Sequence, residues 1–189
     1  MKDKYFKILD NDKSCNGGDF TWSLPTQNED ESYTPGEWHE IEGELQMCFH
    51  GFHVTKDISQ WVNQNSQNRT VYEVEIDETK QILESNYSDK IAVKKLRLVV
   101  PFTGLNQRGE NSTQCVNGKV HSDNDSPAII RRDKQTREWW KNGALHREDK
   151  LPAITRLITK IKTDFDLLCP IQEFWHEGVF QHAIYPQHL

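Results

Sequence analysis

An Asn-Gly-x-x-His pattern occurs twice in the C-terminal half of the chain, and it constrains the fold more than any other feature of the sequence. Residues 142–146 (Asn-Gly-Ala-Leu-His) repeat residues 117–121 (Asn-Gly-Lys-Val-His) at an offset of 25, and Pro-Ala-Ile follows each copy, at 127–129 and 152–154. A partial third copy at residues 174–180 has its Gly 35 residues after that of the second copy and lacks Pro-Ala-Ile. The C-terminal half therefore contains a repeated unit.

Asn-Gly between β-forming residues is the strongest short signal for a tight hairpin, because a type I′ turn needs positive φ at both central residues. Asn142 and Gly143 meet this requirement, so each copy predicts one hairpin. A single hairpin cannot bury its own apolar face, so neighbouring copies must stack, and terminal copies are usually degenerate. Pro127 and Pro152 cannot donate to a ladder, so we expect them at strand starts or edges.

The charge of the 189-residue chain changes where the repeats begin. Residues 1–105 carry 11 Lys and Arg against 18 Asp and Glu, a net −7, whereas residues 106–189 carry 12 against 11, a net +1. A polar, glycine-containing segment at 104–112 separates the two parts, as a linker does. We therefore predict a small acidic α+β domain over 1–105 and a stack of antiparallel β-hairpin repeats over 106–189, in a β-rich α+β protein.

Composition argues against several functional classes. No apolar run approaches the roughly 20 residues that cross a bilayer, and the charged start Met1-Lys2-Asp3-Lys4 lacks a signal-peptide pattern, so we expect a cytoplasmic protein with no membrane partner. Neither half is basic enough to predict nucleic-acid binding. The four cysteines form no CxxC pair, which favours reduced thiols, and no sequence motif predicts a cofactor. They are Cys15, Cys48, Cys115 and Cys169.

Local patterns predict the elements of the first half. Residues 45–55 indicate a strand, a glycine turn and then Thr55 capping a helix that carries Ile58, Trp61 and Val62 at helical spacing. Residues 70–76 alternate as a half-buried strand with an acidic outer face. Residues 91–100 predict one strand whose phase slips at Lys94-Lys95, which suggests a bulge.

Two resemblances rest on these motifs. Gly51-Phe52-His53-Val54-Thr55 and Asp89-Lys90-Ile91-Ala92-Val93, with the Val-Tyr-Glu-Val-Glu strand between them, resemble an uncharacterised domain family of bacteriophage and bacterial proteins. The hairpin copies, with their Trp-x-Asn-Gly-x-x-His-Arg pattern, are similar to repeats of phage and giant-virus proteins and to MORN-type repeats. Neither resemblance implies an established activity.

Cys48, His50 and His53 fall within six residues, and Cys15 or His39 could complete a tetrahedral zinc site. Against this, a strand would point Cys48 and His50 the same way while His53 lies beyond the glycine turn. A buried thiol and two histidines packed around a turn is the alternative, and we predict no metal.

An enzymatic alternative comes from the order of elements around His53, which is similar to that of ADP-ribosyltransferases acting on NAD. Glu73 and Glu75 share one strand face, as two carboxylates do when one stabilises an oxocarbenium-like centre and the other orients the nucleophile. The Ser-Thr-Ser element of that family is absent, and so is its partner Arg or His on the first strand. Two glutamates on an amphipathic strand otherwise form a solvated face.

The repeats offer a binding alternative. His121, Trp140, His146 and Arg147 could line a ligand surface, because a stack presents equivalent side chains periodically. Basic residues interleaved with Trp also build nucleotide sites, so a nucleotide-binding or nucleotide-sequestering protein is a further possibility. Nearby acids neutralise much of that charge, and the aromatic residues would alternatively form core.

Without a catalytic motif such as a phosphate loop or HExxH, we predict a non-enzymatic interaction protein. The phage resemblance implies that it binds and blocks a host protein, for instance a component of antiviral defence. The acidic set Glu29, Asp30 and Glu31 falls on a predicted loop and would steer a partner with a basic surface. The alternatives are the transferase and the nucleotide-binding protein.

Overall fold

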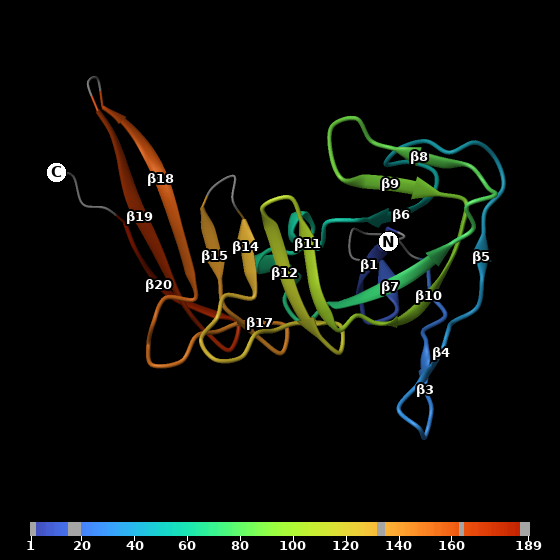
Figure 1. The fold of residues 1–189 in the computed structure, drawn as a ribbon, viewed down its shortest axis with the longest axis horizontal. Coiled ribbons are helices and arrows are strands. Elements are labelled where there is room, and N and C mark those ends of the chain that lie inside the picture. Colours follow the sequence, from blue (N-terminus) through green and yellow to red (C-terminus); the bar gives the residue numbers. More distant parts are fainter. Residues whose placement is uncertain (1–2, 15–19, 132–134, 163–164, 186–189) are drawn as a thin grey trace.

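The computed structural model of the chain describes residues 3–14, 20–131, 135–162 and 165–185. Two large antiparallel sheets lie beside each other along the longest axis, one from each half of the sequence (Figure 1). The described residues contain no α-helix, only two short 3-10 turns, η1 (Ile58–Gln60) and η2 (Gln64–Ser66). No helix in this part of the chain has the length and apolar character needed to cross a membrane.

The first sheet has the order β5-β10-β7-β1-β6-β9-β8, and β2 pairs with β1. A separate hairpin of β3 and β4 projects from this half of the molecule (Figure 1). The strands are β1 (Tyr5–Asp10), β2 (Lys13–Ser14), β3 (Thr26–Gln27), β4 (Tyr33–Thr34), β5 (His39–Glu40), β6 (Phe52–Thr55), β7 (Thr70–Ile76), β8 (Ile82–Glu84), β9 (Lys90–Val93) and β10 (Lys95–Pro101).

The second sheet has the order β11-β12-β14-β15-β18-β19-β20; β13 pairs with β12, and β16 pairs with β17 as a separate ribbon. Its strands begin where the hairpin repeats were predicted. They are β11 (Gly104–Arg108), β12 (Asn111–Val116), β13 (Lys119–Val120), β14 (Ile129–Arg131), β15 (Thr136–Glu138), β16 (Trp140–Lys141), β17 (Ala144–Leu145), β18 (Ile154–Lys162), β19 (Phe165–His176) and β20 (Val179–Ile184).

The predicted hairpin turns are confirmed. Both central residues have positive φ in each copy, as a type I′ turn requires. The values are 47° and 73° at Asn117 and Gly118, 50° and 82° at Asn142 and Gly143, and 47° and 81° at Glu177 and Gly178. Pro127 and Pro152 lie two residues before β14 and β18, as expected of residues that cannot donate to a ladder.

The second and third turns are bonded to the preceding hairpin in the same way. The turn glycine donates its N–H to the carbonyl of the residue two positions after the previous turn glycine: Gly143 to Val120 at 2.9 Å, and Gly178 to Leu145 at 3.0 Å. The stack therefore repeats one contact, as quasi-one-dimensional repeat proteins do.

Residues 67–71 of the first half run across all three turns and donate to the carbonyl of each turn glycine. The bonds join Val71 N to Gly118 O (2.7 Å), Asn68 N to Gly143 O (2.8 Å) and Gln67 Nε2 to Gly178 O (2.9 Å). This segment thereby ties the stack to the first sheet.

One hydrophobic cluster crosses between the two halves. Its first-half members are Phe6, Ile8, Ile58, Val62, Val71 and Phe102, and its second-half members are Cys115, Val120, Ala128, Ile129, Trp140, Leu145 and Ile154. A second cluster, including Trp22, Phe52 and Leu98, covers the other face of the first sheet. The chain passes from the first sheet to the second between Pro101 and Gly104, but the two sheets share a core, and the division into two domains stays a prediction.

The α+β character of the first half is wrong, because the predicted helix is absent. Residues 58–66 form the two 3-10 turns, and the cap of the first is Asp57, whose side chain accepts from Ser59 N, rather than Thr55. Asn63 caps the second turn through a capping box with Ser66. Short polar side chains bond the local backbone in turns and so compete with a longer helix.

Two strand predictions in this half are also corrected. Residues 46–50 form a turn with Cys48 at φ 70°, so the strand begins only at Phe52. Lys94 is a bend between two separate strands: β9 pairs with β6 and β8, and β10 pairs with β7 and β5. A phase slip marks either a bulge or a change of partner, and here the chain changes partner. The strand predicted over 70–76 is confirmed as β7.

Candidate functional site

The first sheet opens between β1 and β6. These strands share a single register pair, Phe6 with Thr55, whereas β1 pairs with β7 through five residues and β6 pairs with β9 through four. A cavity of about 550 Å³ lies at this opening and is lined by residues of both strands. This volume lies within the usual range for small-molecule sites.

Lys7 lies in the opening. It is only 8% exposed although it carries a long cationic side chain. Its Nζ donates to the carbonyl oxygen of His53 on β6 at 3.0 Å and lies 4.4 Å from the centre of the Trp22 ring. A β6 carbonyl thus accepts from a lysine side chain beside the opening, and a buried cation lines the cavity.

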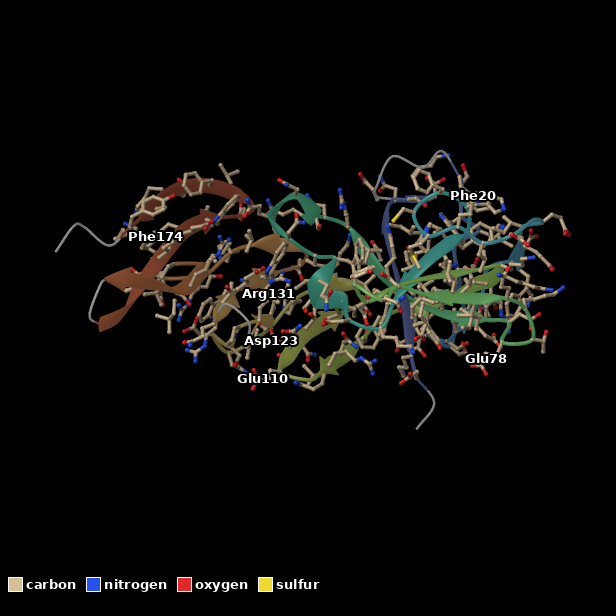
Figure 2. All side chains as sticks on the ribbon, turned by 90° about the horizontal axis from the view of Figure 1, so that it is seen from above. Phe20, Glu78, Glu110, Asp123, Arg131 and Phe174 are labelled. Atoms are coloured by element: carbon tan, nitrogen blue, oxygen red, sulfur yellow. The ribbon has the colours of Figure 1, made fainter. Side chains whose placement is uncertain are left out.

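Aromatic rings form one wall of the cavity. Phe20, Trp22 and Phe52 lie edge to face or tilted at centroid separations of 4.8–5.3 Å. Trp22 and Phe52 are buried, whereas Phe20 is 37% exposed and Phe49, also in the lining, is 89% exposed. Phe20 lies in the half of the molecule away from Phe174 of the hairpin stack (Figure 2). Partly exposed aromatic faces of this kind stack planar ligands.

Lys90 supplies the second charge of the lining. Its Nζ lies 5.3 Å from the Trp61 ring centre and 3.3 Å from Cys48 Sγ. Lys56, Lys80 and Lys95 each pair with carboxylates, but within the described ranges Lys90 has none within 4 Å. The indole Nε1 of Trp61 is buried and has no hydrogen-bond partner in the described part of the chain.

The nearest carboxylate in sequence to Lys90 is directed elsewhere. Asp89 Oδ2 accepts from the backbone N–H groups of Lys56 at 2.7 Å and Asp57 at 2.5 Å, and from the Thr55 hydroxyl. Among the described residues that line the cavity, two are lysines and none is Asp or Glu. The first half as a whole carries a net charge of −7, so the cavity lining is opposite in charge to the half that contains it.

His53 is neutral near pH 7. Burial, followed by the charges of Lys90 and Lys7, lowers the pKa of its imidazole to about 4. Its Nε2 accepts from the backbone N–H of Cys48 at 3.0 Å, so the ring proton is on Nδ1. The side chain fixes the turn at 46–50 against β6 and lines the cavity without a charge.

The described side chains of the zinc alternative each contact other protein groups. His53 Nε2 accepts from Cys48 N, His50 Nε2 bonds to Glu42 O at 2.7 Å, and Cys48 Sγ contacts Lys90. His39 accepts from Ser23 N at 3.2 Å, and Cys15 lies outside the described residues. No group of three potential ligands is arranged around a metal position in the part of the chain that is described.

Glu73 and Glu75, the carboxylates of the transferase alternative, do not line the cavity that His53 lines. Glu73 pairs with Lys4 at 2.7 Å, and Glu75 pairs with Arg97 at 2.6 Å. Both pairs are partly exposed on the first sheet. The structure therefore separates the two glutamates from the histidine that was grouped with them.

The predicted acidic binding set lies at the tip of the β3–β4 hairpin. Glu29, Asp30 and Glu31 are exposed, and the hairpin projects from the first sheet (Figure 1). Asp30 accepts from the backbone and hydroxyl of Ser32 at 3.1 and 2.5 Å, and Asn28 N donates to Ser32 O at 2.8 Å. These bonds give the tip one defined conformation.

The predicted binding residues of the repeats make contacts within the stack. Trp140 is 1% exposed and donates its Nε1 to Glu138. Asn142 N donates to His121 Nδ1 at 3.0 Å, so the histidine of one copy holds the turn of the next. In the same way Glu177 N donates to His146 Nδ1 at 3.2 Å.

Arg147 fixes the loop that joins two copies. Its guanidinium lies 3.8 Å from the Trp139 ring centre and pairs with Asp125 at 2.6 Å. It also donates to Pro152 O at 3.3 Å.

Burial raises the pKa of the Cys115 thiol in this half to about 12, so that thiol is inert near pH 7.

A second cavity, of about 590 Å³, lies between the η1–η2 segment and the second sheet. Arg131, which Figure 2 labels, pairs there with Glu138 at 2.9 Å and donates to Val62 O at 2.5 Å. Arg156 lies 3.3 Å from Glu173. Because these arginine charges are compensated within the protein, the first cavity is the stronger candidate site.

Sequence patterns pointed to His53 but missed Lys7, Lys90, Trp22 and Trp61. One signal was available: Lys7 interrupts the apolar run at residues 5–9, and a charge inside a buried strand is seldom without a function or a buried partner. The other residues are brought together only by the pairing of β6 with β1 and β9, which local patterns do not encode.

A family model described as a domain of unknown function, DUF7666, matches residues 4–107. The comparison with curated proteins and the comparison with solved structures found no match. The matched residues include every described residue that lines the first cavity. The predicted resemblance to an uncharacterised domain family is thereby confirmed, while a phage origin and the likeness of the repeats to MORN-type repeats stay predictions.

Proposed function

We propose that this chain, which belongs to the DUF7666 family, binds an anionic small molecule with a planar ring, of the nucleotide type, in the cavity between β1 and β6. The observation that carries the proposal is the composition of the lining: Lys7 and Lys90 stand beside an aromatic wall, with no described carboxylate. An anionic group would lie near Lys90, and a ring would pack on Phe20 and Phe49.

The same geometry supports binding rather than turnover. The glutamates of the transferase alternative lie outside the cavity, and His53 uses its Nε2 to accept a backbone N–H. A protein of this kind binds or sequesters its ligand.

Isothermal titration with AMP, adenosine and inorganic phosphate tests the proposal, since AMP carries both ligand features and the others carry one each. We expect AMP to bind more tightly than either fragment and to quench Trp fluorescence, because Trp22 and Trp61 line the cavity. Lys90→Glu should weaken AMP binding by at least roughly tenfold, about 1.4 kcal/mol. Equal binding of AMP by wild type and Lys90→Glu would contradict the proposed site.

Lys95→Gln is a matched control. Lys95 also lies over a Trp ring, 5.7 Å from the centre of Trp38, but it pairs with Glu40 outside the cavity. Its loss should leave AMP affinity within roughly twofold of wild type, as for a charge outside the contact area. GMP, CMP and UMP are titrated in the same way as AMP. If none of the four binds, the ligand is not a mononucleotide and the proposed class is wrong.

The projecting β3–β4 hairpin favours a second candidate function. On this interpretation the chain is a phage-encoded cytoplasmic protein that binds and blocks a host factor with a basic surface, and the MORN-like repeats supply further contact area. Support comes from the ordered, exposed tip with Glu29, Asp30 and Glu31. Affinity capture from bacterial lysate should retain a salt-sensitive partner that the Glu29→Lys, Asp30→Lys, Glu31→Lys variant loses; capture of the same proteins by both would contradict it.

A further inference from the structure

The second cavity, between the η1–η2 segment and the second sheet, is lined almost entirely by polar side chains. Among the described residues of its lining only Val62 and Ile154 are apolar. Three are charged, and the others carry a hydroxyl or a side-chain amide: Ser59, Gln60, Asn63, Gln64, Asn111 and Thr136. A ligand that fills this space of about 590 Å³ must therefore form hydrogen bonds along most of its surface.

One face of the second sheet forms one wall of this cavity. Arg131 on β14 pairs in register with Thr136 on β15, and Glu138 on β15 pairs with Ile154 on β18. Arg156 lies two residues after Ile154, so it projects from the same face of the sheet. Two arginines, from the strands on either side of β15, thus face one cavity.

The charges of this wall are compensated by neighbouring acids. Arg131 pairs with Glu138 at 2.9 Å, and Arg156 lies 3.3 Å from Glu173. A guanidinium carries five N–H groups in one plane. Arg131 directs Nε at Glu138 and Nη2 at Val62 O, which leaves further N–H groups for a ligand. The wall therefore offers donors with little net charge.

The opposite wall belongs to the η1–η2 segment, where other protein groups hold the polar side chains in place. Asp57 is 4% exposed and accepts from the Ser59 hydroxyl at 2.6 Å and from Gln60 Nε2 at 3.3 Å. Because the amide nitrogen of Gln60 is directed at Asp57, its Oε1 is directed away and can accept from a ligand. Asn63 Oδ1 accepts from Asn65 N at 2.8 Å, so its amide nitrogen remains a donor. This wall offers acceptors and donors in positions set before a ligand binds.

We propose that this cavity binds a neutral polyhydroxylated ligand of the sugar class. A hydroxyl donates one hydrogen bond and accepts two, so a ring of hydroxyls matches walls that carry both donors and acceptors. Neighbouring hydroxyls also suit a planar guanidinium, whose fork bonds two oxygens side by side. An anion would meet arginines that are already paired, and an apolar ligand would leave Gln60 and Arg156 without partners. The cavity is separate from the one between β1 and β6, so this inference does not depend on the function proposed for that site.

Amide-resolved NMR of the full chain during titration with glucose, galactose, ribose and maltose tests the proposal. We expect at least one of these sugars to shift the signals of residues 59–64, 136–138 and 154–156, with a dissociation constant of order 1 mM. The signals of residues 48–54 and 90, at the first cavity, should stay unchanged. Shifts confined to the first cavity, or no shift with any of the sugars up to about 50 mM, would overturn the proposal.

Arg156→Lys keeps a positive charge beside Glu173 but loses the planar fork. The affinity for the sugar that binds should fall at least roughly fivefold, because a site built to bond hydroxyls loses a paired donor. The melting temperature should change little, which separates a lost contact from lost structure. Arg137→Lys is the matched control, because Arg137 is exposed on β15 between Thr136 and Glu138 and so faces the other side of the sheet. Equal sugar affinity in the two variants would overturn the proposal.

Discussion

The hairpin stack and the first sheet differ in how completely neighbouring elements are hydrogen-bonded to each other. In the stack, Gly143 and Gly178 donate to the preceding hairpin and Gly118 donates to Phe102 O. The carbonyl of each of these glycines accepts from residues 67–71, so the turns are hydrogen-bonded on both sides. In the first sheet, β1 and β6 are neighbours that share one register pair, and the space between them holds a lysine and a cavity.

The difference shows where a β-protein has room for a ligand. In the stack the same turn-to-hairpin contact is repeated from copy to copy. The backbone groups of the turns are therefore already bonded within the protein and do not bind a ligand. A site can form where strand pairing is interrupted and a side chain, instead of a neighbouring backbone N–H, bonds to a strand carbonyl. Lys7 does this when its Nζ donates to His53 O. The opening in the first sheet is accordingly the stronger candidate for a small-molecule site.

The largest effect should come from breaking the closure of the turns. A Cβ at Gly118 would lie 2.5 Å from Thr70 Cγ2 and 2.9 Å from Val71 O, at a φ of +73°. Gly118→Ala should therefore lower the free energy of unfolding by about 2–4 kcal/mol, measured by urea denaturation. Gly109→Ala separates the two causes, because Gly109 has φ +55° and nothing within 4 Å, and it should cost only about 1 kcal/mol. Equal costs at the two sites would mean that residues 67–71 do not hold the turns.

These turns were also the part of the fold that the sequence predicted best. Asn-Gly determines its own backbone conformation, so Asn142 and Gly143 could be placed without knowing their neighbours. The role of His121 was not predictable in this way, because its partner, Asn142, is reached only once the copies are stacked.

The first sheet was harder to predict because its determinants are distant in sequence. The Lys94 bend looked like a bulge because a change of strand partner leaves the same phase slip. Lys90 meets Trp61 and Cys48 only through the turn at 46–50 and the order of strands. Pairing between strands distant in sequence determines both the Lys94 bend and the position of Lys90. The periodicity of hydrophobic residues does not predict such pairing.

The opening in the first sheet should make stability depend on pH through His53. Its pKa is about 4 in the folded protein against an ordinary value of 6.5, so the unfolded chain binds the proton more readily between these values. The stabilisation is complete above pH 6.5 and is lost as pH falls toward 4. Because His53 is partly exposed, we expect the loss to be about 1–2 kcal/mol, below the full value of the shift.

His53→Gln is the control for that pH dependence, since an amide oxygen can still accept from Cys48 N and does not titrate in this range. Denaturation at pH 7, 6, 5 and 4 should give a wild-type curve that falls more steeply than that of the variant. Parallel curves would show that His53 titrates normally and that the opening is more solvated than its burial indicates.

A smaller effect is expected at the loop between copies. Arg147→Lys keeps the charge but loses the planar guanidinium that stacks on Trp139 and holds both oxygens of Asp125. The free energy of unfolding should fall by about 1 kcal/mol. Lys141→Ala, which removes a solvent-exposed pair with Glu148, should lower the free energy of unfolding by clearly less than Arg147→Lys does. A loss from Lys141→Ala as large as that from Arg147→Lys would mean that the loop is held by charge alone.

The smallest effect should be that of Glu75→Gln, and it decides whether β7 or the opening beside β1 carries the function. Glu75 is 48% exposed and its partner Arg97 is 32% exposed, so the pair should contribute less than about 0.5 kcal/mol to the free energy of unfolding. Because Glu75 does not line the cavity, AMP affinity should also be unchanged, and the protein should not consume NAD. Thermal unfolding, titration with AMP and an NAD-depletion assay on wild type and variant check all three expectations. NAD turnover that disappears with Glu75→Gln would place the chemistry on the face of β7 and leave the cavity without the function proposed for it.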